Sequence, residues 1–252
     1  MYFSAKNEGI TCLDGNDFRM SDDEIMQALS GHVLLSAESA KELIKRGFGK
    51  YIGVDVRDWK GKATNAEKVY IDGKWSLVTA QKKMKELVIS DSKVIINSMV
   101  YNTVDNENYE ELFPGCTIFP NELGGRVVTF SGSPDVPYDI MNAFGFLNYT
   151  RKKQFISLFS QTEDFPAYCT GDEELYFKCA RLCDGRLLCA VFNFGFDPID
   201  VIEMMFEKTP RKITKLTPDG KESEISFEKS DDGYIIDSCC NTLEPVILFV
   251  ED

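Results

Sequence analysis

Residues 31–40 read Gly31-His32-Val33-Leu34-Leu35-Ser36-Ala37-Glu38-Ser39-Ala40, and the fold of the first part of the chain follows from them. The first half is a short apolar run, which is typical of a strand buried on both faces. Ser36 or Ser39 can then cap a helix whose apolar residues Ala40, Leu43 and Ile44 recur at helical spacing. The stretch therefore predicts a strand that passes directly into a helix.

Strands and helices also alternate before and after this stretch. Ile10–Leu13 is a short apolar run, and Ser21 with Glu24 forms the capping pattern of a helix start. A further strand is expected at Tyr51–Val54, after a helix that stops at Gly47. This order of elements predicts parallel strands joined by crossover helices. Three strands leave a sheet edge open, so either later strands complete the sheet or the chain is the tail of a longer architecture.

Residues 60–150 are richer in strands. Residues 68–77 alternate around Asp72-Gly73, a strong signal for a β-hairpin. Further strands are expected at 93–101, 116–122 and 125–132, a loop at 105–108 and a helix over 149–161.

Every segment after Pro166 reads as a strand. A hairpin is expected at 174–193, followed by strands at 201–206, 212–216, 224–227, 234–237 and 246–250. Turn signals between closely spaced strands are typical of an antiparallel β-sandwich. We therefore expect two domains, residues 1–163 and 164–252.

The charge and composition of the chain exclude several classes of partner. The 252 residues include 28 Lys and Arg against 41 Asp and Glu, a net charge of −13. A chain this acidic repels nucleic acid and anionic lipid, and neither is expected as a partner. The sequence has no apolar run long enough to cross a membrane and its first residues do not resemble a secretion signal, so a cytoplasmic location is predicted.

The eight cysteines are expected to be reduced packing residues. Cys179, Cys183 and Cys189 could approach one zinc ion, but a fourth ligand is not evident. Cys239-Cys240 has no histidine nearby. We predict no metal and no cofactor.

Catalytic patterns are scarce. His32 is the single histidine, and it opens an apolar strand, which favours a structural role. The sequence has no nucleophile elbow and no phosphate-binding glycine loop. We therefore assign no catalytic residue.

One segment could contact a sugar. Asp55, Arg57, Asp58 and Trp59 leave a predicted strand end, and they combine hydrogen-bonding groups with an aromatic ring. Trp75, with neighbouring Tyr70, is a second candidate for sugar binding. Two alternatives remain open: Asp55 and Asp58 could form the carboxylate pair of a stand-alone glycosidase, or the loop is simply solvated with Trp59 packed against the next domain.

The chain also resembles a known architecture. The matching segments are Leu13-Asp14-Gly15-Asn16-Asp17-Phe18, residues 21–24, residues 31–40, Leu43-Ile44-Lys45-Arg46-Gly47-Phe48-Gly49, Ile52-Gly53-Val54, Glu122-Leu123-Gly124-Gly125-Arg126-Val127-Val128-Thr129-Phe130, Leu147-Asn148-Tyr149-Thr150-Arg151-Lys152-Lys153-Gln154, Phe165-Pro166-Ala167-Tyr168 and Asn193-Phe194-Gly195-Phe196-Asp197-Pro198. Together they resemble the C-terminal, non-catalytic region of bacterial multidomain glycoside hydrolases of the β-galactosidase type.

This resemblance implies a partial flavodoxin- or glutaminase-like α/β domain, lacking its first strands, followed by an antiparallel β-sandwich. It implies a non-catalytic accessory or oligomerisation role in a carbohydrate-active protein. The expected partners are a catalytic barrel domain or subunit, a second copy of the chain in a homo-oligomer, and carbohydrate. A carbohydrate-binding module is the alternative.

Overall fold

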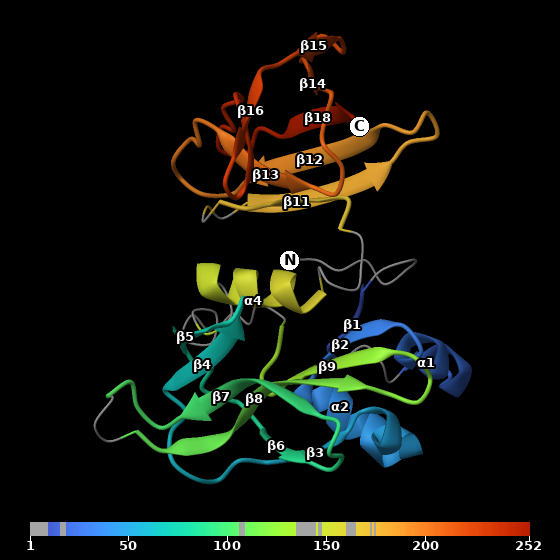
Figure 1. The fold of residues 1–252 in the computed structure, drawn as a ribbon, viewed down its shortest axis with the longest axis vertical. Helices are drawn as coiled ribbons and strands as arrows, with labels where there is room; N and C mark the ends of the chain where they lie inside the picture. Colours follow the sequence, from blue (N-terminus) through green and yellow to red (C-terminus); the bar gives the residue numbers. More distant parts are fainter. Residues whose placement is uncertain are drawn as a thin grey trace. The chain divides into compact units, whose positions relative to one another are not determined.

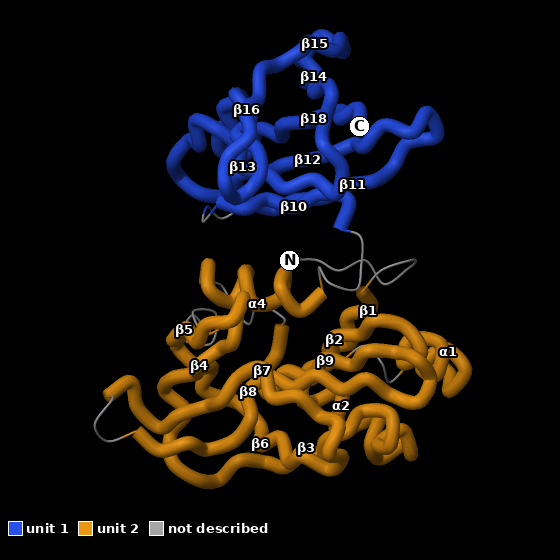
Figure 2. Tube along the Cα trace, viewed as in Figure 1, with its two compact units in different colours: residues 1, 164–252 blue, residues 2–163 orange. Residues whose placement is uncertain are grey.

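The computed structural model describes residues 10–15, 19–105, 109–134, 145, 148–159, 165–171, 173 and 175–252. The chain folds as two compact units, residues 2–163 and residues 164–252 with residue 1 (Figure 2). Strands exceed helices in both, so the protein is β-rich (Figure 1). Most of the loop predicted at 105–108 lies outside the described residues.

A seven-stranded mixed sheet organises the first unit. Three strands at one side are parallel and the other four are antiparallel. In spatial order they are β1 (Ile10–Leu13), β2 (His32–Ser36), β9 (Arg126–Phe130), β8 (Glu111–Pro120), β7 (Ile95–Tyr101), β4 (Ala66–Ile71) and β5 (Lys74–Thr79). Strands from residues 66–130 therefore complete the sheet that β1 and β2 begin.

The predicted helices form as their caps require. α1 (Asp22–Leu29) starts with a full capping box between Ser21 and Glu24. α2 (Ala37–Leu43) follows β2 without a loop, and the hydroxyl of Ser36 accepts a hydrogen bond from the Ser39 amide at 3.2 Å. Both helices thus begin where an unpaired backbone amide finds a side-chain acceptor.

The strand predicted at Tyr51–Val54 is wrong in position, and the parallel pairing expected for it is also wrong. Residues 44–48 form a π turn and residues 49–51 a 3₁₀ turn, and the strand β3 (Val54–Arg57) starts only after them. Gly47 and Gly53 have φ angles of 97° and 77°, so the backbone cannot remain extended here. β3 pairs antiparallel with β6 (Glu86–Ile89), and the strands parallel to β2 are β1 and β9.

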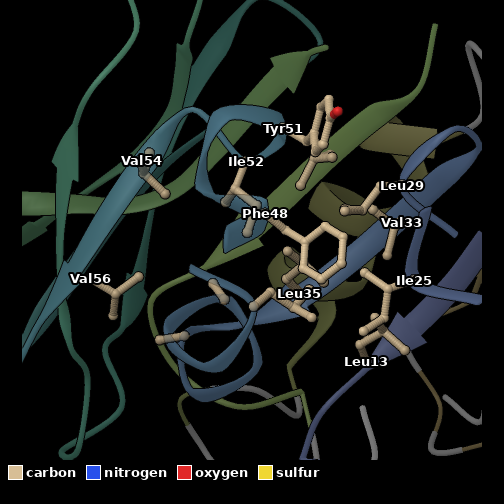
Figure 3. Packing of buried hydrophobic residues seen from close by; sticks show 14 of the residues in the cluster. Leu13, Ile25, Leu29, Val33, Leu35, Phe48, Tyr51, Ile52, Val54 and Val56 are labelled. Carbon is tan, nitrogen blue, oxygen red and sulfur yellow. The ribbon is translucent and has the colours of Figure 1, made fainter. Parts of the chain in front are cut away.

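The main core of this unit lies between the sheet, the two helices and β3 (Figure 3). Ile25 and Leu29 of α1 meet Val33 and Leu35 of β2, and all four side chains are fully buried. Figure 3 shows these residues with Leu13, Phe48, Tyr51, Ile52, Val54 and Val56. Successive side chains of β2 point to opposite faces of the sheet, and Leu34, between Val33 and Leu35, is buried as well. Both faces of β2 are therefore covered, which explains its uninterrupted apolar run.

A third helix, α4 (Tyr149–Phe159), packs on β4 and β5. Phe155 of this helix meets Phe130 of β9 edge to face, with ring centroids 5.9 Å apart. Arg151 of α4 is buried and forms an ion pair with Glu67 of β4. The helix is therefore attached to the sheet by a buried ion pair as well as by aromatic packing.

The second unit consists of two antiparallel sheets around one core. Its strands alternate between buried and half-exposed residues, as in β12 (Leu187–Asn193) and β18 (Val246–Glu251), which is the pattern of a sandwich. One sheet has the order β10 (Ala167–Cys169), β13 (Ile202–Phe206), β17 (Gly233–Ile236), β16 (Phe227–Ser230); the other has β11 (Leu175–Arg181), β12 (Leu187–Asn193), β18 (Val246–Glu251), β14 (Lys212–Leu216), β15 (Glu222–Glu224). The strand predicted at 224–227 is divided between β15 and β16.

No described helix is both long and apolar enough to cross a membrane.

Candidate functional site

The acidic segment predicted to contact a sugar occupies β3 and the loop that follows. Asp55 and Arg57 lie on the strand and face each other, with Nε of Arg57 3.6 Å from Oδ2 of Asp55. The other oxygen of Asp55 accepts a hydrogen bond from the amide of Val56 at 2.9 Å. Both side chains are about half exposed, so this pair can reach solvent.

Asp58 is fixed by two lysines. Its Oδ1 accepts hydrogen bonds from Nζ of Lys41 at 2.8 Å and from Nζ of Lys85 at 2.9 Å. These two ammonium groups lower the pKa of Asp58 from 3.8 to about 2. A glycosidase acid needs a raised pKa, so the local charges oppose that role for Asp58.

Trp59 is held by neighbouring residues. Its indole N–H donates a hydrogen bond to the carbonyl oxygen of Lys62 at 2.7 Å, and its ring packs edge to face on Phe113 at 4.9 Å. A Cβ atom added at Gly61 would lie 2.3 Å from the indole, which means that the backbone covers one side of the ring. The arrangement is that of a packing residue.

Trp75 lies in a different place, on β5 at the edge of the seven-stranded sheet. Asp72 and Gly73 have φ angles of 48° and 82°, which fit the tight turn expected of an Asp-Gly hairpin. The turn sets Tyr70 directly opposite Trp75, with ring centroids 5.2 Å apart and an interplanar angle of 57°. Trp75 is 55% exposed and Tyr70 42%.

Two further residues join this surface. Lys68 of β4 is opposite Leu77 of β5, which is 50% exposed. Because alternate residues of a strand share a face, Lys68, Tyr70, Trp75 and Leu77 form one surface, named here the β4–β5 face. Nζ of Lys68 lies 4.3 Å from the ring centroid of Tyr109 and 4.8 Å from that of Tyr101.

The five site residues predicted from sequence fall into two groups. Asp55, Arg57, Asp58 and Trp59 lie on or just after β3, and Trp75 lies on the β4–β5 face.

Leu77 and Lys68 are absent from the site predicted from sequence, although the hairpin itself is predicted. Counting outward from Asp72-Gly73 gives the pairs Tyr70–Trp75 and Lys68–Leu77. The register of the turn is thus the signal that identifies them.

The cysteines form no metal site among the residues that the structure describes. All eight are free thiols. Cys179 lies opposite Cys189 in the pairing of β11 and β12, whereas Cys183 is exposed in the turn between these strands. Burial raises the pKa of the Cys189 and Cys116 thiols, which keeps both protonated. His32 starts β2, opposite Arg126 of β9.

A shallow depression in the second unit is lined by charged side chains, among them Asp184, Arg186 and Asp252. Arg186 makes ion pairs at 2.8 Å with Asp184 and with Glu222, and Asp252 pairs with Arg181 and Lys208. These charges are satisfied within the sandwich.

Comparison with known proteins gives a fold but no close relative. No protein-family model matches the chain, and no curated protein matches its sequence. Among solved structures, it is similar to α-L-fucosidase isoenzyme 2 from Paenibacillus thiaminolyticus, with a TM-score of 0.55 and 11% sequence identity. The similarity covers 96% of this chain and 40% of the fucosidase chain. The likeness therefore shows a fold related to part of a glycoside hydrolase.

Proposed function

We propose that this chain is a non-catalytic accessory region of a carbohydrate-active protein of the glycoside-hydrolase type. The observation that carries the proposal is the extent of the structural similarity. Nearly the whole chain, 96%, corresponds to only 40% of a fucosidase chain. Such a match is expected if the chain corresponds to a subset of the modules of a larger enzyme.

The chemistry of the described residues supports the same proposal. Glycoside hydrolysis in most families uses two carboxyl groups, one of which must hold a proton near neutral pH. Asp58 is paired with Lys41 and Lys85, and Asp55 lies beside Arg57. Glu67 is buried in an ion pair with Arg151, where no substrate can reach it. Each of these three acids therefore lies beside a basic partner.

In this proposal the chain contributes by binding other domains or subunits. A catalytic barrel domain or subunit supplies bond cleavage, and the α/β unit and the sandwich supply surfaces for assembly. The β4–β5 face fits this role because it exposes Trp75, Tyr70 and Leu77 together. Aromatic residues of this kind are enriched in protein interfaces.

The experiment is an activity assay on the purified chain. Aryl glycosides, including an aryl α-L-fucoside, are incubated with the chain and with the Asp55→Asn/Asp58→Asn double variant. We expect no turnover above the buffer rate for either protein. Turnover that the double variant abolishes would contradict the proposal and support a stand-alone glycosidase.

A further inference from the structure

β5 is the last strand of the seven-stranded sheet. It pairs with β4 on one side, and no other strand in the described part of the chain pairs with its other side. Hydrogen-bonded and non-hydrogen-bonded pairs alternate outward from a two-residue turn. The bond from the Ala80 amide to the Asn65 carbonyl oxygen agrees with this alternation. Trp75, Leu77 and Thr79 therefore direct their backbone N–H and C=O groups away from β4.

Among the residues that the structure describes, this edge lacks the protection that sheet edges usually have. Edge strands are commonly short, bulged or charged, which prevents pairing with another strand. β15 is three residues long and reads Glu222-Ser223-Glu224, and β16 carries Glu228 and Lys229. β5 has six residues in unbroken register with β4, and its Trp75-Ser76-Leu77-Val78 centre carries no charge.

The geometry points to β5 as a strand that pairs antiparallel with β5 of a second copy of this chain, which joins two seven-stranded sheets into one. The inference rests on the accessory role proposed above and names a partner for it. It assigns the β4–β5 face to contact between subunits.

The pleat restricts the pairing to two registers. A two-fold axis must place outward-directed backbone groups opposite each other and keep each side chain on its own face. Of the axes that do this within Lys74–Thr79, those at Ser76 and at Leu77 pair five residues of each strand, whereas the others pair three or fewer, so we retain these two registers. The first sets Trp75 opposite Leu77 of the second copy, and the second sets Leu77 opposite Leu77. Leu77 therefore lies beside the axis in the first register and on it in the second, and in both it faces a side chain of the second copy.

The charges of the hairpin allow two copies to approach. Residues 66–79 contain Glu67 and Asp72 against Lys68 and Lys74, so their formal charges cancel, whereas the whole chain carries −13. In either register Lys74 lies opposite an uncharged residue, Val78 or Ala80. Like charges therefore do not oppose each other across the new strand pair.

The same face could instead bind a sugar, but its geometry favours a strand. Sugar sites combine a ring with several polar groups that converge on one ligand. Here the rings of Tyr70 and Trp75 are tilted by 57°, and Leu77, beside Trp75 on the same face, has no polar atom in its side chain. The polar groups at this edge that have no partner in the described part of the chain are backbone N–H and C=O groups, which a β-strand matches.

The test is sedimentation velocity of the full chain over a range of concentrations. We expect reversible dimerisation, and Leu77→Glu should weaken it by about tenfold or more because two-fold symmetry doubles the effect. In the monomer, Glu at 77 would face Lys68 of its own hairpin, so the fold is retained and a thermal melt can verify this. Ile95→Glu, at a side chain that is 56% exposed on β7, is the matched control and should leave dimerisation unchanged.

A charge-swap mixture separates the two registers. Leu77→Glu and Leu77→Lys chains should each be monomeric, and mixing them should restore a dimer if the axis lies at Leu77. If the axis lies at Ser76, the mixture stays largely monomeric while the unmodified chain dimerises.

Three outcomes would overturn the inference. They are a monomer at every concentration, a dimer that Leu77→Glu leaves intact, and a monomer whose Trp75→Ala variant loses calorimetric binding of a fucosylated oligosaccharide. The last outcome would assign the face to a sugar. Because none of these measurements involves glycoside turnover, they fail independently of the activity assay that tests the proposed function.

Discussion

Glu67 and Arg151 form an ion pair with two parallel hydrogen bonds in the interior of the first unit. Nη1 of Arg151 lies 2.9 Å from Oε1 of Glu67, and Nη2 lies 2.5 Å from Oε2. The two side chains are 0% and 1% exposed. Ser98 donates a further hydrogen bond to Glu67, and Gln154 accepts one from Arg151 at 2.6 Å. The pair joins α4 to β4 through charges that have no access to water.

Removing one partner of this pair should destabilise the first unit. Glu67→Gln or Arg151→Met leaves the other charge buried without its counter-ion, and the expected loss is roughly 3–5 kcal/mol. The Glu67→Met/Arg151→Met double variant should lose less, because no charge stays buried. Urea unfolding measures all three, with the exposed Lys153→Met on the same helix as control. A single-variant loss no greater than that of Lys153→Met would contradict this account.

Asp58 should titrate well below an ordinary aspartate. Its pKa of about 2 results from hydrogen bonds with Lys41 and then Lys85. Since the folded pKa is lowered, its contribution to stability is complete above about pH 4 and is lost as the pH falls towards 2. Carboxyl NMR titration should find the midpoint near 2. Lys41→Met and Lys85→Met should each raise it towards 3.8, whereas Lys45→Met, whose lysine pairs with Glu42, should not.

Gly61→Ala should disturb the loop that holds Trp59. The added methyl group would lie 2.3 Å from the indole, so either the ring or the backbone must move. Overpacking of this kind costs typically 1–3 kcal/mol. Gly31→Ala is the control, because the nearest atom to its new Cβ is 3.6 Å away. Chemical denaturation followed by tryptophan emission compares the two, and equal stability would show that the ring packing is unimportant.

Tyr101 should ionise late. Burial and then the hydrogen bond of its hydroxyl to Glu111 raise its pKa to about 12. The contribution to stability is therefore present below about pH 10 and is lost as the pH rises towards 12. Ultraviolet titration should show one tyrosine with this midpoint, and Glu111→Gln should lower it. The Tyr70→Phe variant should leave that late midpoint unchanged.

The sequence predicted those elements whose structure depends on residues close together in the chain. The Ser21–Glu24 capping box, the passage from β2 to α2 at Ser36 and the Asp72-Gly73 hairpin are all confirmed. Each depends on hydrogen bonds or turn angles within a few residues, which a sequence displays directly.

Elements that depend on distant partners were harder to predict. The third strand was placed too early because nothing local shows that Gly53 takes a positive φ beneath the ring of Phe119. The second partner of β2 is β9, whose register joins His32 to Arg126, and no periodicity links segments so far apart. Trp59 and Trp75 looked alike in the sequence, but only Trp75 lies on an exposed surface with Tyr70.

The place of β9 between β2 and β8 affects how the protein is made. The N-terminal helices bury their apolar faces against a sheet in which β9, the neighbour of β2, ends at Phe130. During synthesis on the ribosome, β2 therefore cannot pair with β9 until residues 126–130 have been made. This delay slows folding and leaves apolar surface exposed, where chaperones can bind it. Truncations that stop before Arg126 should accordingly accumulate as aggregates rather than as a smaller folded protein.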